Sequence, residues 1–215
     1  VSGAVLSLAS IDSFWASTGA TQVFDPRIHY DPFNNRWLIA AVSNAQNSNS
    51  SVLVGLSHSP DPQGTFSLYR FNVGCAAGSP GCRAQGEWAD FPMLGFNKNW
   101  VAVAWNQFTI NSGSFLDGQV LVLDHPSLRG GVANSTLFSG VSAANAGFCM
   151  HPAATYSTTE NILYLPSHQS SSAAAYRLHT ITGTSEAPVF TVGALQTRPG
   201  GAWLQPGGDI LPQQC

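Results

Sequence analysis

The hydrophobic residues of this chain fall into short runs that turn-forming residues separate. Runs such as residues 37–42, 52–56 and 100–105 are rich in Val, Ile, Leu, Ala and Trp, and Gly, Pro, Asn or Asp lie between the runs. Short apolar segments bounded by such residues are typical of β-strands. No segment shows a sustained apolar period of 3.6 residues with helix caps, so the pattern predicts an all-β fold.

Three stretches of the chain begin in the same way. Pro26, Pro92 and Pro152 each open an expected strand that ends in an aromatic residue four positions later. Proline is tolerated at the first residue of a strand, where no ladder hydrogen bond is lost. A polar turn follows each of these strands. The second apolar strands are then expected at residues 37–42, 100–105 and 162–165.

Two further strands are expected after each hairpin. The third strands are expected at residues 51–56, 118–123 and 173–178, and the fourth strands at 65–71, 135–138 and 188–192. Four antiparallel strands repeated in tandem are typical of the blades of a β-propeller. We therefore predict one propeller or partial propeller over residues 1–215. Its three complete four-stranded blades are expected at roughly 24–86, 87–147 and 148–200.

A β-sandwich is the alternative architecture, because its strands also recur at regular spacing. It does not require the same four-strand pattern three times, so the propeller is favoured. Three blades do not close a ring, since propellers usually have about four to eight. Strand-like pieces at residues 5–8, 14–15 and 202–204 either form a fourth blade or belong to a larger ring. In the second case, the partners would be the missing blades or another copy of the chain.

Composition limits the class of protein and the partners that this chain can have. Only 9% of the 215 residues are charged, against about 25% in typical domains, yet 11% are aromatic, which argues against disorder. The eight Lys and Arg residues are scattered and the net charge is −3, so no nucleic-acid partner is expected. No apolar run approaches the roughly 18 residues of a membrane-spanning helix. The first residues lack the basic start of a signal peptide, which indicates a processed chain or a fragment.

Four cysteines point to an oxidising compartment. Cys75 and Cys82 bracket a short loop of turn-forming residues, which predicts a disulfide between them. A zinc site would need further ligands in paired spacings that this sequence lacks. Cys149 and Cys215 are left to pair with each other, to stay free or, for Cys215, to reach a partner. We expect a secreted or cell-surface protein.

Several phrases resemble one group of proteins. They are FDPRIHYDP at residues 24–32, HSPDPQGTF at 58–66, WADFPMLGFNKNW at 88–100 and RLHTITGT at 177–184. Together they resemble secreted, mostly bacterial propeller-like proteins of uncharacterised function, over roughly residues 14–212. The resemblance implies a fold and a location, and favours a segment of a longer ring. It implies no reaction.

Asp25, Asp90 and His151 lie one or two residues before the three strand-opening prolines. Residues at the start of inner propeller strands can line a central channel, so these side chains could together bind a divalent cation such as Ca²⁺. The alternative is that they belong to ordinary turns at strand entry, where Asp bonds the local backbone. No other cofactor is expected.

The sequence contains two other kinds of candidate site. Asn49 and Asn134 each begin an Asn-x-Ser/Thr pattern for N-glycosylation. Trp88 and Trp105, near strand ends, are candidate sugar-stacking rings for ligand binding, although blade cores also need large aromatic residues. No serine-nucleophile motif occurs, and catalytic residues stay unknown.

Three functions follow from this sequence. The first is a secreted binding module that presents polar loops to a glycan or a cell-surface protein. The second is an exported enzyme that degrades polysaccharide by hydrolysis or elimination. The third is a structural unit of a cell-surface assembly.

Overall fold

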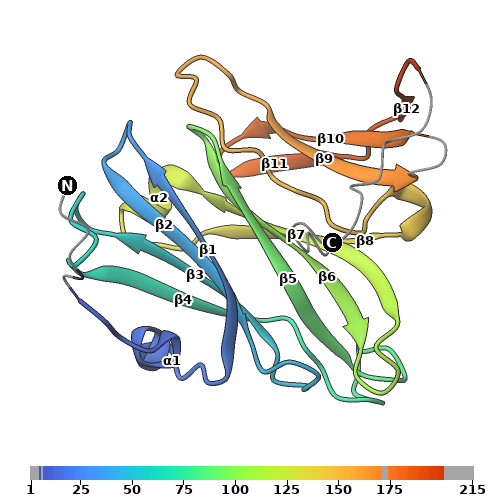
Figure 1. Ribbon diagram of the computed structural model, residues 1–215, viewed down its shortest axis with the longest axis horizontal. Coiled ribbons are helices and arrows are strands. Elements are labelled where there is room, and N and C mark those ends of the chain that lie inside the picture. The colour runs from blue at the N-terminus through green and yellow to red at the C-terminus, as the bar shows by residue number, and fades with distance from the viewer. Residues whose placement is uncertain (1–4, 6, 171–173, 201–215) are drawn as a thin grey trace.

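The computed structural model describes residue 5 and residues 7–170 and 174–200. Within these residues the fold is all-β, with three four-stranded antiparallel sheets (Figure 1). This confirms the all-β prediction. The expected piece at 202–204 and Cys215 lie outside the described residues. None of the helices in the described ranges is long and apolar enough to cross a membrane.

The first two sheets are meanders in which each strand pairs with the next one along the chain. The first sheet contains β1 (Val23–Asp31), β2 (Arg36–Ser43), β3 (Ser51–Ser57) and β4 (Phe66–Asn72). The second contains β5 (Glu87–Phe96), β6 (Trp100–Thr109), β7 (Phe115–Asp124) and β8 (Ser135–Val141). These eight strands lie close to the expected positions, because apolar runs and turn residues alternate so regularly there.

Pro26 and Pro92 were predicted to open their strands, which is wrong: both lie inside β1 and β5, at the same irregularity. The register shifts between Phe24 and Arg27 in β1, and between Asp90 and Met93 in β5. In each case two residues oppose one on the neighbouring strand, which is a β-bulge. A bulge accommodates proline because the ladder is interrupted there.

The third sheet differs from its predicted composition. It contains β9 (Leu163–Ser170), β10 (Ala175–Thr184), β11 (Ala187–Thr191) and β12 (Leu195–Thr197). The short strands β11 and β12 pair with successive parts of one edge of β10, and β9 pairs with the other edge. The predicted fourth strand at 188–192 corresponds to β11, and β12 is a further strand that was not predicted.

The strand expected at residues 151–156 was wrong, although the segment lies beside β9. The N–H groups of His151 and Ala153 donate to the carbonyls of Pro166 and Tyr164 at 3.0 and 2.9 Å. Pro166 has no N–H to donate in return, and the Ala153 carbonyl accepts from Phe96 of β5 at 3.1 Å instead. A reciprocal ladder therefore cannot form, and the segment joins β9 to β5.

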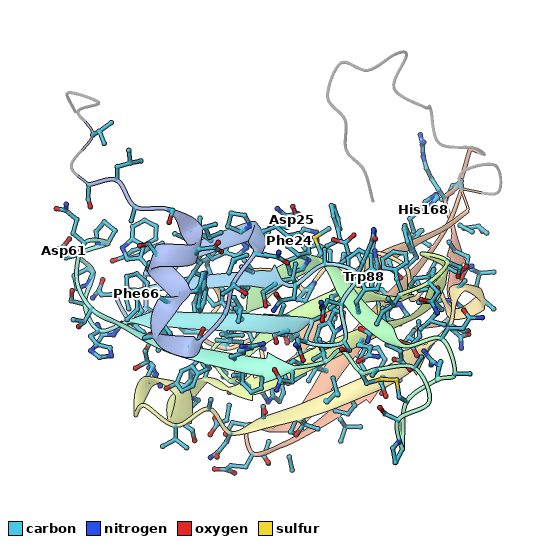
Figure 2. The ribbon with its side chains drawn as sticks, turned by 90° about the horizontal axis from the view of Figure 1, so that it is seen from below. Phe24, Asp25, Asp61, Phe66, Trp88 and His168 are labelled. Atoms are coloured by element: carbon cyan, nitrogen blue, oxygen red, sulfur yellow. A yellow bond between two sulfur atoms is a disulfide. The ribbon has the colours of Figure 1, made fainter. Side chains whose placement is uncertain are left out.

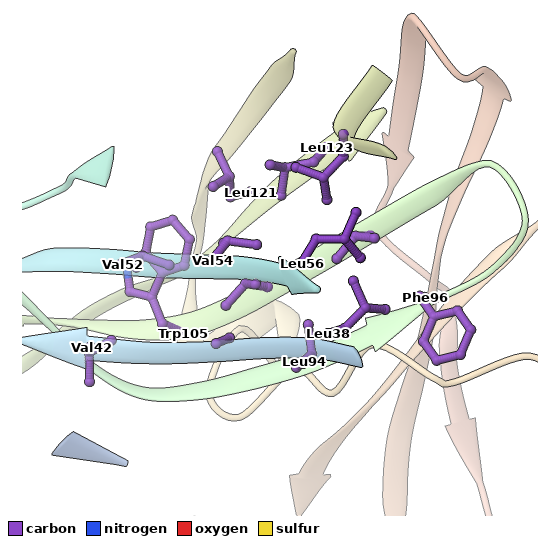
Figure 3. Close-up of a cluster of buried hydrophobic side chains, with 14 of the residues drawn as sticks. Leu38, Val42, Val52, Val54, Leu56, Leu94, Phe96, Trp105, Leu121 and Leu123 are labelled. Atoms are coloured by element: carbon purple, nitrogen blue, oxygen red, sulfur yellow. The ribbon is translucent and has the colours of Figure 1, made fainter. Parts of the chain in front are cut away.

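The second sheet lies between the other two and is apolar on both faces. The side chains of Leu94 of β5 and Trp105 of β6 pack toward the first sheet with Leu38 and Val54 (Figure 3). Alternate residues of β6, Trp100 among them, join a second core with Leu163 and other residues of the third sheet. Strands buried on both faces read as continuous apolar runs. This explains the uninterrupted tract at residues 100–105.

The outer face of the first sheet is covered by the N-terminal helix α1 (Ile11–Trp15), as Figure 2 shows. Ser10 caps this helix by accepting the N–H of Ser13 at 3.1 Å. Trp15 is fully buried against Ala41 and Leu53. The strand expected at residues 14–15 was therefore wrong. On the third sheet's outer face, by contrast, Leu178 and Val189 are 41% and 53% exposed.

A second short helix, α2 (His125–Arg129), follows β7 and closes the other side of the first core. Its His125 is completely buried. The ring Nδ1 lies 3.0 Å from the Asn97 carbonyl, and Nε2 lies 3.4 Å from Oδ2 of Asp31. Burial is the main cause that lowers the pKa of His125. The contacts tie α2 to the turns that follow β1 and β5.

Gly95 of β5 allows the segment 151–155 to lie directly on the second sheet. A Cβ at this position would meet the Pro152 carbonyl oxygen at 2.1 Å. Real side-chain carbons do not approach a backbone oxygen so closely, and the backbone cannot rotate away as a flexible side chain would. The absence of a side chain at Gly95 is therefore a condition for joining β5 to β9.

We expect Gly95→Ala to lower the free energy of unfolding by about 2–3 kcal/mol, because the added methyl overpacks this contact. Chemical denaturation measures the change. Gly130→Ala is the matched control, since a Cβ there meets its nearest atom at 3.2 Å and φ is −78°. Equal stability of the two variants would contradict the role given to Gly95.

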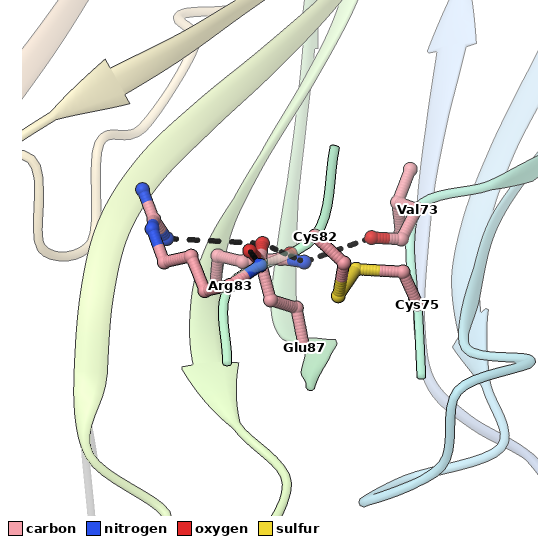
Figure 4. The surroundings of a disulfide bond; sticks show 6 residues. Val73, Cys75, Cys82, Arg83 and Glu87 are labelled. Carbon is pink, nitrogen blue, oxygen red and sulfur yellow. Dashed lines mark hydrogen bonds and ion pairs between the residues drawn. A yellow bond between two sulfur atoms is a disulfide. The ribbon is translucent and has the colours of Figure 1, made fainter. Parts of the chain in front are cut away.

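The predicted disulfide between Cys75 and Cys82 is confirmed (Figure 4). The two cysteines are seven residues apart in the sequence, and the bond closes a loop in the connection between β4 and β5. Next to it, the Arg83 guanidinium pairs with Glu87 at 3.7 Å and with buried Asp117 at 2.6 Å, and the hydrogen bond to Asp117 raises the pKa of Arg83. The loop is thus held to the second sheet by a covalent bond and by charge.

Replacing both Cys75 and Cys82 by Ser should lower the free energy of unfolding by about 2.5 kcal/mol, the loop-closure entropy of so short a loop. Denaturation with and without a dithiol reductant provides the control. Reductant should destabilise the natural chain and leave the double variant unchanged. The prediction would be contradicted if the natural chain had the same free energy of unfolding with and without reductant.

Candidate functional site

The bulges of β1 and β5 bring polar side chains from three distant segments to one region. The residues concerned, which we call the strand-start cluster, are Asp25, Arg27, Asp90, Phe91 and His151. Figure 2 shows Asp25 beside Phe24. β1 and β5 pack against each other, and the segment after His151 bonds to the far end of β5. The cluster therefore lies where β1, β5 and the segment that precedes β9 meet.

The charge of Asp25 acts on the second carboxylate of the cluster, Asp90. Asp90 accepts the N–H of Phe91 at 2.7 Å. Partial burial raises the pKa of Asp90, and the negative charge of Asp25 raises it further against the opposing effect of that hydrogen bond. Asp25 and Asp90 thus form a carboxylate pair in which one member is held toward its neutral form.

The cationic side of the cluster lies around Arg27. Its guanidinium carbon is 5.2 Å from the centre of the Phe91 ring, a cation–π contact. His151 is exposed, yet partial burial lowers its pKa, and the positive charges of His29 and Arg27 lower it further. His29 itself donates from Nε2 to the Leu94 carbonyl at 3.0 Å and so links β1 to β5.

Asp25 and Phe91 occupy strained backbone positions, with φ values of 50° and 58°. For residues with a Cβ, the left-handed region costs roughly 1–2 kcal/mol. Both residues precede proline within a bulge, and both carry side chains of the cluster. Strain of this kind is often found where side-chain direction matters for function.

The predicted metal ligands Asp25, Asp90 and His151 lie in one region but do not form a compact ligand set. Among the described residues, only Cys75, Cys82 and Glu87 place three potential ligand atoms within 4.8 Å of one another. The two cysteines of that set are bonded to each other. A Ca²⁺ ion held by Asp25, Asp90 and His151 stays a prediction.

The tryptophans predicted to stack on a ligand lie in the interior. Trp88 and Trp105 are 7% and 2% exposed. Their indole N–H groups donate to the Thr109 carbonyl at 3.2 Å and to Gln107 Oε1 at 2.8 Å. Neither ring offers a free face, so this prediction is corrected: both residues are core residues.

The glycosylation and remaining cysteine predictions concern surface and loop residues. Asn49 and Asn134 are both exposed, as an acceptor must be, and their glycosylation stays a prediction. The Cys149 N–H donates to Oδ1 of Asn106 at 2.8 Å, and the amide of Asn106 lies 3.5 Å from its sulfur. Pairing of Cys149 with Cys215 involves a residue outside the described ranges.

A buried serine–histidine pair in the third sheet is structural. Ser167 Oγ and His179 Nε2 are 2.8 Å apart, and the Gly193 N–H donates to Nδ1 of the same ring at 3.3 Å. Burial lowers the pKa of His179, against a backbone hydrogen bond to Ala146 that raises it. These contacts join β9, β10 and the segment after β11, which is a structural role.

Sequence reasoning missed Arg27 and Phe91. Both are next to Pro26 and Pro92 in the sequence, but their contact depends on how β1 lies against β5. Comparison with protein-family models, with curated proteins and with solved structures finds no match. The geometry of the site must therefore support any function by itself.

The raised pKa of Asp90 predicts a pH effect on stability. The unfolded-state pKa is about 3.9, so the folded chain binds more protons just above that value, and the free energy of unfolding falls as pH rises through this window. Asp90→Asn keeps an oxygen that can accept the Phe91 N–H but removes the charge. The variant should melt at a higher temperature than the natural chain at pH 7.

The melting temperatures of the variant and the natural chain should converge toward pH 3, where Asp90 is neutral in both states. Asp61→Asn, in an exposed loop, is the matched control. Its melting temperature should change between pH 7 and pH 3 by as much as that of the natural chain. A lower melting temperature for Asp90→Asn at pH 7 would overturn the assignment.

Proposed function

We propose that this chain is an extracellular binding module, built from propeller-type blades, that binds a glycan at the strand-start cluster. The disulfide between Cys75 and Cys82 supports an extracellular location, because such bonds persist in oxidising surroundings. The blade arrangement and the chemistry of the cluster support the rest.

Three features support propeller-type blades. The first two sheets are four-stranded meanders, and the second packs face to face between the other two. Bulges recur at Pro26 and Pro92. Five residues after each of Pro26, Pro92 and Pro152, a side-chain oxygen accepts the N–H groups two and three positions further on. These capping residues are Asp31, Asn97 and Ser157.

The arrangement of the first strands agrees with a shared axis. β1 contacts β5 through the His29 bond to Leu94, and β5 bonds to the segment 151–155 through Phe96. In a propeller the first strand of each blade is the innermost, and neighbouring inner strands lie side by side around the channel. The strand-start cluster would then lie at one mouth of this channel.

The observation that carries the glycan proposal is the convergence of acceptors, donors and an aromatic ring in this cluster. Carboxylates of Asp25 and Asp90 accept hydrogen bonds from sugar hydroxyls, and Arg27 and His151 donate to sugar oxygens. Phe91 adds an apolar surface. Polar sites of this kind fix the orientation of a ligand through a few well-placed groups.

The raised pKa of Asp90 beside Asp25 favours a second candidate, an exported polysaccharide-degrading enzyme. Glycoside hydrolysis commonly uses two carboxyl groups, one of them kept protonated as a general acid. In this version Asp90 is the acid and Asp25 is the base or nucleophile.

Glycan-array screening followed by calorimetry tests the binding proposal. Arg27→Gln and Asp25→Asn should each weaken the binding of a glycan hit by about tenfold, the value of one lost charged hydrogen bond. The matched control Arg198→Gln, in the segment after β12, should leave affinity unchanged. Equal affinity of all variants would overturn the assignment of the site.

Incubation of each hit with the protein separates the two candidates. Chain shortening that Asp90→Asn and Asp25→Asn abolish would establish the enzyme. Unchanged polysaccharide, bound in a way that depends on Arg27, would establish the binding module.

A further inference from the structure

Two neighbouring cavities lie on either side of Arg129, the last residue of α2. The larger one, of about 290 Å³, is lined among others by Arg36, His58, Ser67 and Arg129. The smaller one, of about 190 Å³, is lined by Phe33, Asn97, Lys98 and Arg129 among others. Their walls come from β1, β2, β3, β4, α2 and the turns after β1 and β5. They belong to the opposite end of β1 from Asp25 and share no residue with the strand-start cluster.

The two cavities gather three of the eight Lys and Arg residues of a chain whose net charge is −3. Within the described ranges, the Arg129 guanidinium forms no hydrogen bond and no ion pair. Arg36 donates only to the neighbouring Asn35 carbonyl at 3.0 Å, and Lys98 donates to the Thr159 carbonyl at 3.4 Å. Most of their N–H donors therefore have no acceptor among the described residues, and Arg129 itself is exposed.

Negative charge in these walls is confined to one engaged carboxylate. The larger cavity has no acidic residue in its lining. Asp31 lines the smaller one but is 1% exposed and accepts the backbone N–H groups of Phe33 and Asn34 and the Asn34 amide. The accessible surface around Arg129 is thus positive, although the chain as a whole is negative.

Two further features of the smaller cavity point to a ligand with both polar and flat apolar parts. Asn97 is fully buried in its wall, and the side-chain N–H₂ has no acceptor among the described residues. Unpaired buried donors are rare and costly. At the rim, Phe33 is 48% exposed. An aromatic ring beside cationic donors suits a sugar that carries an anionic group.

We propose that these two cavities together bind a linear acidic polysaccharide, with carboxylate or sulfate groups placed on both sides of Arg129. Each cavity is small compared with the roughly 300–1,000 Å³ of usual ligand sites. One cavity therefore suits a single sugar, and the pair suits a short oligomer. The guanidinium of Arg129 lies between them and can bridge two anionic groups through separate N–H donors.

This inference is independent of glycan binding at the strand-start cluster, and the variants separate the two. Calorimetry with oligogalacturonides and with heparin oligosaccharides distinguishes carboxylate from sulfate as the anionic group. Arg129→Gln should weaken binding by about tenfold or more. Arg198→Gln, which lies in the segment after β12 and outside both sites, is the charge-matched control and should bind as the natural chain does.

Three further measurements test the class of ligand. Affinity should fall as NaCl increases, because solvent-facing charges are screened. Tetramers should bind more tightly than monomers, because they reach both cavities. Neutral cello-oligosaccharides should bind at least tenfold more weakly than the acidic oligomers.

Several results would overturn the proposal. These are equal affinity of Arg129→Gln and the natural chain, no binding of either acidic oligomer, equal binding of neutral oligomers, or no gain from monomer to tetramer. Poly-glutamate that binds as tightly as the sugars, with the same dependence on Arg129, would assign the surface to acidic proteins instead. Thermal melting of Arg129→Gln checks that the variant folds.

Discussion

The structure depends on the second sheet, which buries apolar side chains on both faces. β6 contributes Val101, Val103 and Trp105 to one core and Trp100 and Ala102 to the other. The cores on the inner faces of the two outer sheets both depend on this middle layer, since an apolar sheet face must pack against another element. The helices, the disulfide loop and the polar regions are attached to this three-layer arrangement.

The layered core could be predicted from the sequence to the extent that strands follow apolar runs. The strands of the first two sheets were predicted well, because turn residues mark nearly every boundary. The segment 151–156 was not, because its pairing depends on the missing N–H of Pro166 and on Phe96, which is far away in sequence. Trp15 was also misassigned: its short helix is too brief to show a helical period, although Ser10 supplies a cap.

The polar regions were less predictable than the core. Spacing relative to the prolines indicated Asp25, Asp90 and His151, and the structure brings their segments together. The Arg27–Phe91 contact and the cavities around Arg129 depend on the packing of separate sheets, which no local pattern records. Trp88 and Trp105 illustrate the reverse error, since an aromatic residue near a strand end is equally suited to a core.

The helix α1 makes the two ends of the layered stack different. One end is closed by Trp15 and its neighbours, which occupy the outer face of the first sheet. The other end exposes Leu178 and Val189 on the third sheet. Like a solenoid with one capping repeat, the stack has a direction. A further layer would gain buried apolar area at the third sheet without displacing any of the residues that the structure describes, whereas at the first sheet it would have to replace α1.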